Sequence, residues 1–138
     1  LMTTIVAVDA VGSMIFGSKR ARRFLPGHGS AVRPPLFSED LADEFIMVDD
    51  LECVVGCRLL AQTEGILAGA SSGAIVTAVE RFRKRIPEGA LCVAILADRG
   101  ERYLDTVYSD EWVRKHFGDV SERWRRDRED KIWATAAF

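Results

Sequence analysis

The segment Glu64–Ile75, EGILAGASSGAI, decides how this sequence is interpreted. It lies between two stretches with helical periodicity, and it combines glycines at 65, 69 and 73 with serines at 71 and 72. Glycine lets a backbone pass close to a ligand, and serines just before an apolar periodic run are typical of a helix N-cap. The segment therefore predicts a loop that presents hydroxyl and N–H groups at the positive end of a helix. Simple capping and ligand binding are both open interpretations.

The elements around this loop predict an α/β fold. Apolar, β-branched runs indicate buried strands over residues 3–9, 44–48 and 91–96. Helical spacing indicates helices over residues 51–62, with Asp49 or Asp50 as the cap, and over 72–85 and 110–117. This alternation predicts a three-layer domain with a mainly parallel sheet. Three strands are few for such a sheet, so we expect an incomplete C-terminal portion of a larger domain.

Beyond residue 108 the composition changes. Residues 121–133, SERWRRDREDKIW, predict a strongly charged helix whose apolar anchors are Trp124, Ile132 and Trp133. We therefore divide the chain into an α/β part, 1–108, and a charged helical extension, 109–138.

Bulk properties exclude several classes of protein. The 138 residues carry a formal net charge of −2, which gives no electrostatic reason to expect nucleic acid or a membrane surface as a partner. No apolar run approaches the roughly 20 residues of a membrane span, and the N-terminal residues do not resemble a signal peptide. We expect a cytoplasmic protein.

The cysteines are expected to be free and buried. Cys53, Cys57 and Cys92 occur without secretory signals, so reduced thiols that act as small apolar side chains are the natural interpretation. The two histidines, His28 and His116, are in no zinc-like spacing, and we expect no metal site.

A second candidate loop carries one of these histidines. Pro26-Gly27-His28-Gly29-Ser30 places a histidine between two glycines, which predicts a tight backbone of a kind common in functional loops. Two interpretations stay open: His28 contacts a substrate, or it faces solvent.

Two motifs in order carry a family resemblance. EGILAGASSGAIV at 64–76, a buried strand, and then DRGERYLDTVY at 98–108 resemble the C-terminal part of cysteine-synthase-like enzymes. These are the fold-type II (tryptophan synthase β-like) enzymes that depend on pyridoxal phosphate (PLP), and they include cystathionine β-synthase. The VDAVGSMIFG and PGHG segments most resemble the subfamily that makes a 2,3-diaminopropionate precursor for siderophores from O-phosphoserine and glutamate.

The resemblance implies a function and a set of site residues. It implies β-elimination or β-replacement on a serine derivative of the O-phosphoserine or O-acetylserine type through an aminoacrylate, with glutamate or sulfide as nucleophile, in a homodimer. Ser71 would hydrogen-bond the pyridine nitrogen of PLP, and Gly65, Gly69 and Ser72 would complete the cofactor side. A hydroxyl does not hold that nitrogen protonated as an aspartate does, so the ring is a weaker electron sink. Gly27, His28 and Gly29 would line the substrate side, and Asp98 with the GERY turn would frame the ring edge.

The sequence also departs from the family. Nothing in it matches the S-x-K-x-R motif of the Schiff-base lysine or the Gly/Thr-rich phosphate cup, and Ser18-Lys19-Arg20 has the wrong spacing for the former. We therefore expect no catalytic residue in this chain and no activity from the chain alone. The alternatives are a non-catalytic α/β interaction module and a pseudo-enzyme remnant of the same fold.

Overall fold

The fold is that of a computed structural model, which describes residues 3–17 and 19–125. Two parallel strands, β1 (Val6–Ala10) and β2 (Glu44–Val48), pair in register from Val6 opposite Glu44 to Ala10 opposite Val48. Three α-helices follow: α1 (Asp50–Glu64), α2 (Ala70–Phe82) and α3 (Asp110–Phe117). Short 3₁₀ helices cover Glu39–Leu41, Arg83–Arg85, Gly100–Tyr103 and Ser121–Arg123.

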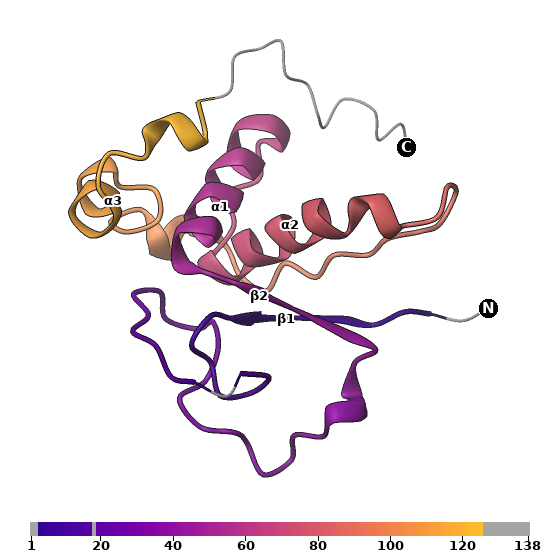
Figure 1. Cartoon of the computed structure of the whole chain (residues 1–138). Helices are drawn as coiled ribbons and strands as arrows, with labels where there is room; N and C mark the ends of the chain where they lie inside the picture. The colour runs from indigo at the N-terminus through magenta and orange to yellow at the C-terminus, as the bar shows by residue number, and fades with distance from the viewer. Residues whose placement is uncertain (1–2, 18, 126–138) are drawn as a thin grey trace.

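The helices α1 and α2 cover one face of the sheet, and the long connection between β1 and β2 lies on the other side (Figure 1). Parallel strands need such a crossover because the chain must return to the end of the sheet where the first strand began before the second strand can run in the same direction. The predicted α/β class with parallel strands is confirmed. The described part of the chain forms a partial domain, with its core between the sheet and the two helices.

Helix α1 begins and ends where its local sequence requires. Asp49 accepts a hydrogen bond from the Glu52 N–H at 2.8 Å, and the Glu52 carboxylate accepts one from the Asp49 N–H at 3.0 Å. This reciprocal capping box satisfies donors that have no partner inside the helix. Gly65 ends the helix in the left-handed region, φ +69°, where a side chain would be strained. Of the two predicted caps, Asp49 is the one used.

Two glycines allow α1 and α2 to pack closely. A Cβ atom at Gly56 would overlap the carbonyl oxygen of Gly73, and a Cβ at Gly73 would overlap the carbonyl oxygen of Cys53. The Thr77 hydroxyl adds a hydrogen bond of 3.1 Å to the Glu52 carbonyl across the same contact. This packing fixes the direction of α2 relative to α1, and with it the position of the loop between them.

The predicted strand over 91–96 is wrong for this chain. The segment carries no strand hydrogen bonds, and Leu91, Val93 and Ile95 are 90%, 75% and 78% exposed. The apolar pattern of a buried strand is present, but a strand forms only where a neighbouring strand offers its backbone groups. Among the described residues no such neighbour lies beside it. Cys92 in this segment is also exposed, contrary to expectation, whereas Cys53 and Cys57 are buried.

The C-terminal part contacts the body through α3 and the residues around Trp124. Arg58 of α1 is buried, and it pairs with Asp110, donates to the Val107 carbonyl at 2.9 Å and lies 4.4 Å from the ring centre of Trp124. Helix α3 occupies the predicted residues. Of the charged helix expected over 121–133, Ser121–Arg123 form a short 3₁₀ helix, and residues 126–133 with Ile132 and Trp133 lie outside the described residues. The domain boundary at 108/109 remains a prediction.

Candidate functional site

The loop between α1 and α2 differs in one respect from the capping interpretation. Gly69, not a serine, is the N-cap of α2, and its carbonyl accepts the Ser72 N–H at 3.0 Å. No side chain caps this helix. The helix begins two residues earlier than predicted because the Gly69 backbone has the extended conformation of a cap, φ −75° and ψ 170°. Ser71 and Ser72 therefore lie inside the first turn.

The two serines have different environments. Ser71 is half-buried, whereas Ser72 is fully buried and its hydroxyl has no hydrogen-bond partner among the described residues. The N–H groups of Ala70 and Ser71, at the very start of the helix, have no acceptor inside it, and they lie at the positive end of its dipole. The start of α2 thus presents hydroxyl and N–H groups together, as the sequence predicts.

The turn at residues 98–103 holds this loop in place. The Gly69 N–H donates to the Asp98 carbonyl at 2.9 Å, and the Gly100 N–H donates to the Leu67 carbonyl at 3.0 Å. The Tyr103 hydroxyl donates to Oδ2 of Asp98 at 2.8 Å. A Cβ at Gly69 would overlap Oδ1 of Asp98, so only glycine lets the loop approach this carboxylate. Asp98 therefore holds the loop against the turn, and its place beside a cofactor ring edge stays a prediction.

Two further side chains hold the loop, and the sequence analysis assigned neither of them. The Tyr108 hydroxyl donates to the Ala68 carbonyl at 2.6 Å and accepts the Ala68 N–H at 3.1 Å. The Cys57 thiol donates to the Gly69 carbonyl at 3.2 Å, and burial raises its pKa to about 11, so it stays a thiol at neutral pH. The position of Tyr108 at the end of the DRGERYLDTVY motif could have indicated its role from sequence. No sequence pattern indicated the role of Cys57.

The histidine loop lies after the end of β1. Gly27 and Gly29 both have positive φ, +77° and +74°, and Ser13 accepts the Ser30 N–H at 3.0 Å. His28 is only 5% exposed, and its Nε2 has no partner among the described residues, so the solvent-facing interpretation is wrong. Burial lowers the pKa of His28, which keeps its imidazole neutral, although the carboxylates of Asp9 and Asp50 partly offset this effect.

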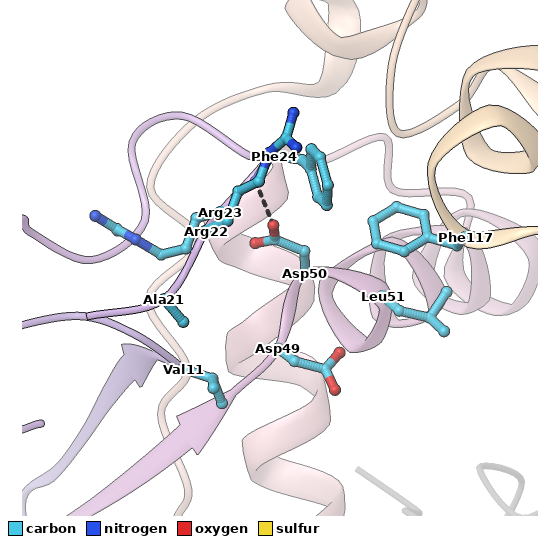
Figure 2. Close-up of a pocket in the computed structure, with 9 residues that line it drawn as sticks. All are labelled: Val11, Ala21, Arg22, Arg23, Phe24, Asp49, Asp50, Leu51 and Phe117. Carbon is cyan, nitrogen blue, oxygen red and sulfur yellow. Dashed lines mark hydrogen bonds between the residues drawn. The ribbon is translucent and has the colours of Figure 1, made fainter. Parts of the chain in front are cut away.

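A pocket of about 240 Å³ lies beside this loop, at the start of α1. Figure 2 shows Ala21, Arg22 and Arg23 on one side, Asp50 beneath Phe24, and Phe117 on the other side. Asp50 accepts the Phe24 N–H, and Arg22 lies 4.9 Å from the ring centre of Phe24. The pocket therefore lies at the carboxyl ends of β1 and β2, which is where ligands bind in open α/β sheets.

The predicted site residues thus occupy two places. Gly65, Gly69, Ser71 and Ser72 lie together around the start of α2, and Gly27–Gly29 lie after β1. No hydrogen bond between described residues joins the two places. The described residues also contain no group of three or more His, Cys, Asp or Glu side chains that could hold a metal ion, and none of their helices is long and apolar enough to cross a bilayer.

The parallel strands, with helices on one face of the sheet, define a partial α/β domain. Its glycine–serine helix start is held in place by the neighbouring turn at residues 98–103. The chain belongs to the pyridoxal-phosphate dependent enzyme family, which its residues 2–98 match. The recognition made from the two motifs is confirmed.

Named relatives agree with this family. The N-(2-amino-2-carboxyethyl)-L-glutamate synthase of Ralstonia nicotianae is 50% identical over 111 residues, which are 80% of this chain and 33% of that protein. The O-acetylserine dependent cystathionine β-synthase of Helicobacter pylori superposes with a TM-score of 0.69 at 32% identity, covering 77% of this chain and 35% of the other. O-ureido-L-serine synthase superposes with the same TM-score of 0.69 at 28% identity, covering 78% of this chain and 37% of the other. The chain therefore spans about a third of the length of these relatives.

The start of α2 fits one end of the family's cofactor. A pyridine ring nitrogen needs a hydrogen-bonding group, and here a half-buried hydroxyl, a buried unpaired hydroxyl and a helix terminus lie within one turn. Gly69 has no side chain, so its backbone is not covered next to these groups. The other end of the cofactor needs the lysine and the phosphate cup, and neither motif occurs in this sequence.

Proposed function

We propose that this chain forms the ring-nitrogen side of the cofactor site in a PLP-dependent enzyme that replaces the β-substituent of a serine-derived amino acid. The observation that carries the proposal is the 50% identity to a glutamate-adding synthase together with the serine-bearing start of α2. The leaving group would be phosphate or acetate, and the incoming nucleophile would be glutamate or, alternatively, sulfide. That the named relatives are synthases speaks against the pseudo-enzyme and non-catalytic alternatives.

In this proposal the residues of the chain bind and orient the ring end of the cofactor. Ser71 donates or accepts at the ring nitrogen, while Gly65 and Gly69 let the backbone pass close to the ring and Ser72 supports the same turn. When bound, the cofactor withdraws electrons from the α-carbon of the substrate, which permits loss of the β-substituent. The lysine that holds the cofactor and moves the α-proton is not in this chain.

The substrate side is assigned to Gly27–Gly29. Their position after β1, next to a pocket at the carboxyl ends of the strands, supports this assignment. The neutral, buried His28 offers a nitrogen that can donate or accept a hydrogen bond without adding charge. We propose an amino acid as the ligand of this side.

The complete enzyme is proposed to be a cytoplasmic homodimer that serves amino-acid or siderophore biosynthesis. The free, buried thiols of Cys53 and Cys57 agree with a reducing compartment. Light scattering of the assembled enzyme tests the dimer, and a mass equal to one copy would exclude it.

Assembly from two polypeptides tests the function. The full chain is mixed with the part of the Ralstonia synthase that lies outside the matched region, and PLP, O-phosphoserine and glutamate are added. We expect a visible absorption band of protein-bound cofactor and formation of the β-replacement product, detected by mass spectrometry. O-acetylserine with sulfide is the parallel assay. A complex that binds PLP but catalyses neither reaction would contradict the proposed function.

Within this complex, Ser71→Ala is expected to lower turnover at least about tenfold, the effect of roughly 1.4 kcal/mol in the barrier, because the ring nitrogen loses its polar contact. Ser72→Ala is the matched control, since its hydroxyl lies one residue further along the same turn. Equal losses in the two variants would refute the assignment of Ser71.

A further inference from the structure

The hydroxyl of Tyr108 binds both backbone polar groups of a single residue, Ala68. It donates to the Ala68 carbonyl at 2.6 Å and accepts the Ala68 N–H at 3.1 Å. Ala68 is only 2% exposed, so water cannot readily take the place of either bond. Burial raises the pKa of Tyr108, so the hydroxyl keeps its proton and stays a donor at neutral pH. The hydroxyl therefore fixes the backbone directly before Gly69, the N-cap of α2.

Two successive residues of α1 hold the two sides of this contact. Arg58 donates to the carbonyl of Val107 at 2.9 Å, and Val107 directly precedes Tyr108 in the chain. Cys57 donates through its thiol to the carbonyl of Gly69 at 3.2 Å. Helix α1 thus holds both the segment that carries the tyrosine and the cap residue that follows its partner. The position at which α2 starts is therefore set from α1.

The loop is also joined to the turn at residues 98–100 by two backbone hydrogen bonds, and these do not involve Tyr108. They remain when the hydroxyl is removed, so the loop and the turn stay attached to each other. What the hydroxyl adds is a fixed position of Ala68, and with it the position from which the first turn of α2 begins. In the proposed function this turn carries Ser71 to the cofactor. A displacement of about 1 Å in such a group can lower a reaction rate about a hundredfold.

We propose that Tyr108 is a positioning residue that, together with Cys57, fixes the start of α2 at the place where this helix meets the ring of the cofactor. Neither side chain is assigned a contact with the cofactor, because each acts through the backbone of residues 68 and 69. The inference rests on the proposed function, since the position of this turn affects a reaction only where the turn contacts the reacting group.

Three variants separate positioning from overall stability. Tyr108→Phe removes the hydroxyl and keeps the ring, so both polar groups of Ala68 lose their partner while the packing is kept. Cys57→Ala removes the bond to the Gly69 carbonyl, and it is the second variant should Tyr108→Phe fail to fold. Thr77→Val is the matched control, because it removes a hydrogen bond of 3.1 Å from α2 to the backbone of α1, about two turns from the helix start. Circular dichroism and urea denaturation establish the fold and the stability of each variant.

Amide hydrogen exchange of the full chain alone gives the first readout. The N–H groups of Ala68 and Ser72 report the start of α2, and the N–H of the buried Ala78 reports a point further along the same helix. We expect Tyr108→Phe to speed exchange at Ala68 at least about tenfold, the effect of one lost hydrogen bond, and to speed it at Ser72 more than at Ala78.

The other two variants complete this comparison. Cys57→Ala should also speed exchange at Ser72 more than at Ala78, because it loosens the cap residue from α1. Thr77→Val should affect Ser72 no more than Ala78. If Tyr108→Phe speeds exchange equally at the start of α2 and further along it, or leaves the start unchanged, the tyrosine contributes only to overall stability and the proposal is overturned.

The second readout is the steady-state kinetics of the complex described above, at saturating PLP. We expect Tyr108→Phe to lower kcat at least about tenfold and to change KM for O-phosphoserine less than about threefold, because the start of α2 and the proposed substrate loop are separate places. Thr77→Val should keep kcat within about twofold of the wild type. A kcat of Tyr108→Phe equal to that of Thr77→Val overturns the proposal. If the wild-type complex binds no PLP, the proposed function fails, and the exchange measurement still decides whether Tyr108 positions the start of α2.

Discussion

At the scale of single residues, Ser71 and Ser72 show how one position changes the role of a side chain. They are neighbours in sequence and lie in the same helical turn, yet Ser71 is half-buried whereas the Ser72 hydroxyl is buried without a partner among the described residues. A buried unpaired hydroxyl costs about 1–3 kcal/mol. We therefore predict that Ser72→Ala leaves the free energy of unfolding unchanged or raises it by about 1 kcal/mol, measured by urea denaturation of the chain. A loss above about 1 kcal/mol would show that the hydroxyl has a partner.

His28 gives a prediction about pH. Burial lowers the pKa of His28 in the folded chain, whereas the unfolded chain keeps the ordinary value of 6.5. Between these two values the unfolded state binds a proton that the folded state does not, so stability falls as the pH drops below about 6.5. Each unit of separation between the two pKa values lowers stability by about 1.4 kcal/mol.

The test compares urea denaturation at pH 7.5 and pH 5.5. The wild-type chain is expected to lose more stability than His28→Gln, in which this proton is absent. If His28→Gln is as pH-dependent as the wild type, other groups cause the acid sensitivity.

The sequence predicted which residues form the loop between α1 and α2, but it did not predict which residues elsewhere in the chain contact that loop. Glycines and serines between two periodic stretches indicate a helix start with exposed polar groups, because backbone requirements and local spacing determine both. The contacts of Asp98 with Gly69 and of Cys57 with Gly69 join residues that are far apart in the chain. No local pattern encodes such contacts, so only the structure reveals them.

At the scale of elements, the contact between α1 and α2 is the most constrained. Gly56 and Gly73 face each other so closely that a methyl group on either would overlap backbone of the other helix. Gly56→Ala is expected to destabilise the chain by about 1–3 kcal/mol, although alanine is the better helix former, because overpacking at the contact exceeds the helix-propensity gain of about 1 kcal/mol.

Thermal or urea denaturation measures this change. Ala61→Gly, on the half-buried surface of the same helix, is the control for propensity and should lower stability by only about 1 kcal/mol. A Gly56→Ala chain that is as stable as the wild type, or more stable, would show that the helices can move apart.

The elements themselves were predictable where local signals sufficed. Strand β2 and helix α3 have the predicted bounds, and the capping residue Asp49 was one of two candidates. Residues 91–96 have an equally clear strand pattern, but a strand depends on a neighbour, and this chain supplies none among the described residues. A local pattern predicts that a segment is suited to a sheet, and the fold decides whether a sheet is there.

At the scale of the whole molecule, residues 91–95 are unusual because they expose large apolar side chains that a complete domain would bury. Three large side chains in alternate positions of one extended segment are exposed together, whereas the chain spans only about a third of its relatives. Apolar surface of this kind marks an interaction site. We predict that the segment becomes protected when the chain assembles with the remaining part of the synthase, because a neighbouring strand then pairs with it.

Hydrogen exchange of residues 91–96, measured before and after assembly, tests this protection.

Two substitutions test how much the segment contributes to the affinity of assembly. Ile95→Lys places a charge where apolar burial is expected. It should weaken assembly at least about tenfold, since burying an unpaired charge costs well above 1.4 kcal/mol. Leu36→Lys changes another exposed apolar residue, which lies in the connection between β1 and β2, and should leave assembly unchanged. If both variants assemble like the wild type, or if residues 91–96 exchange freely in the complex, the exposed segment is not the surface by which this chain completes its sheet.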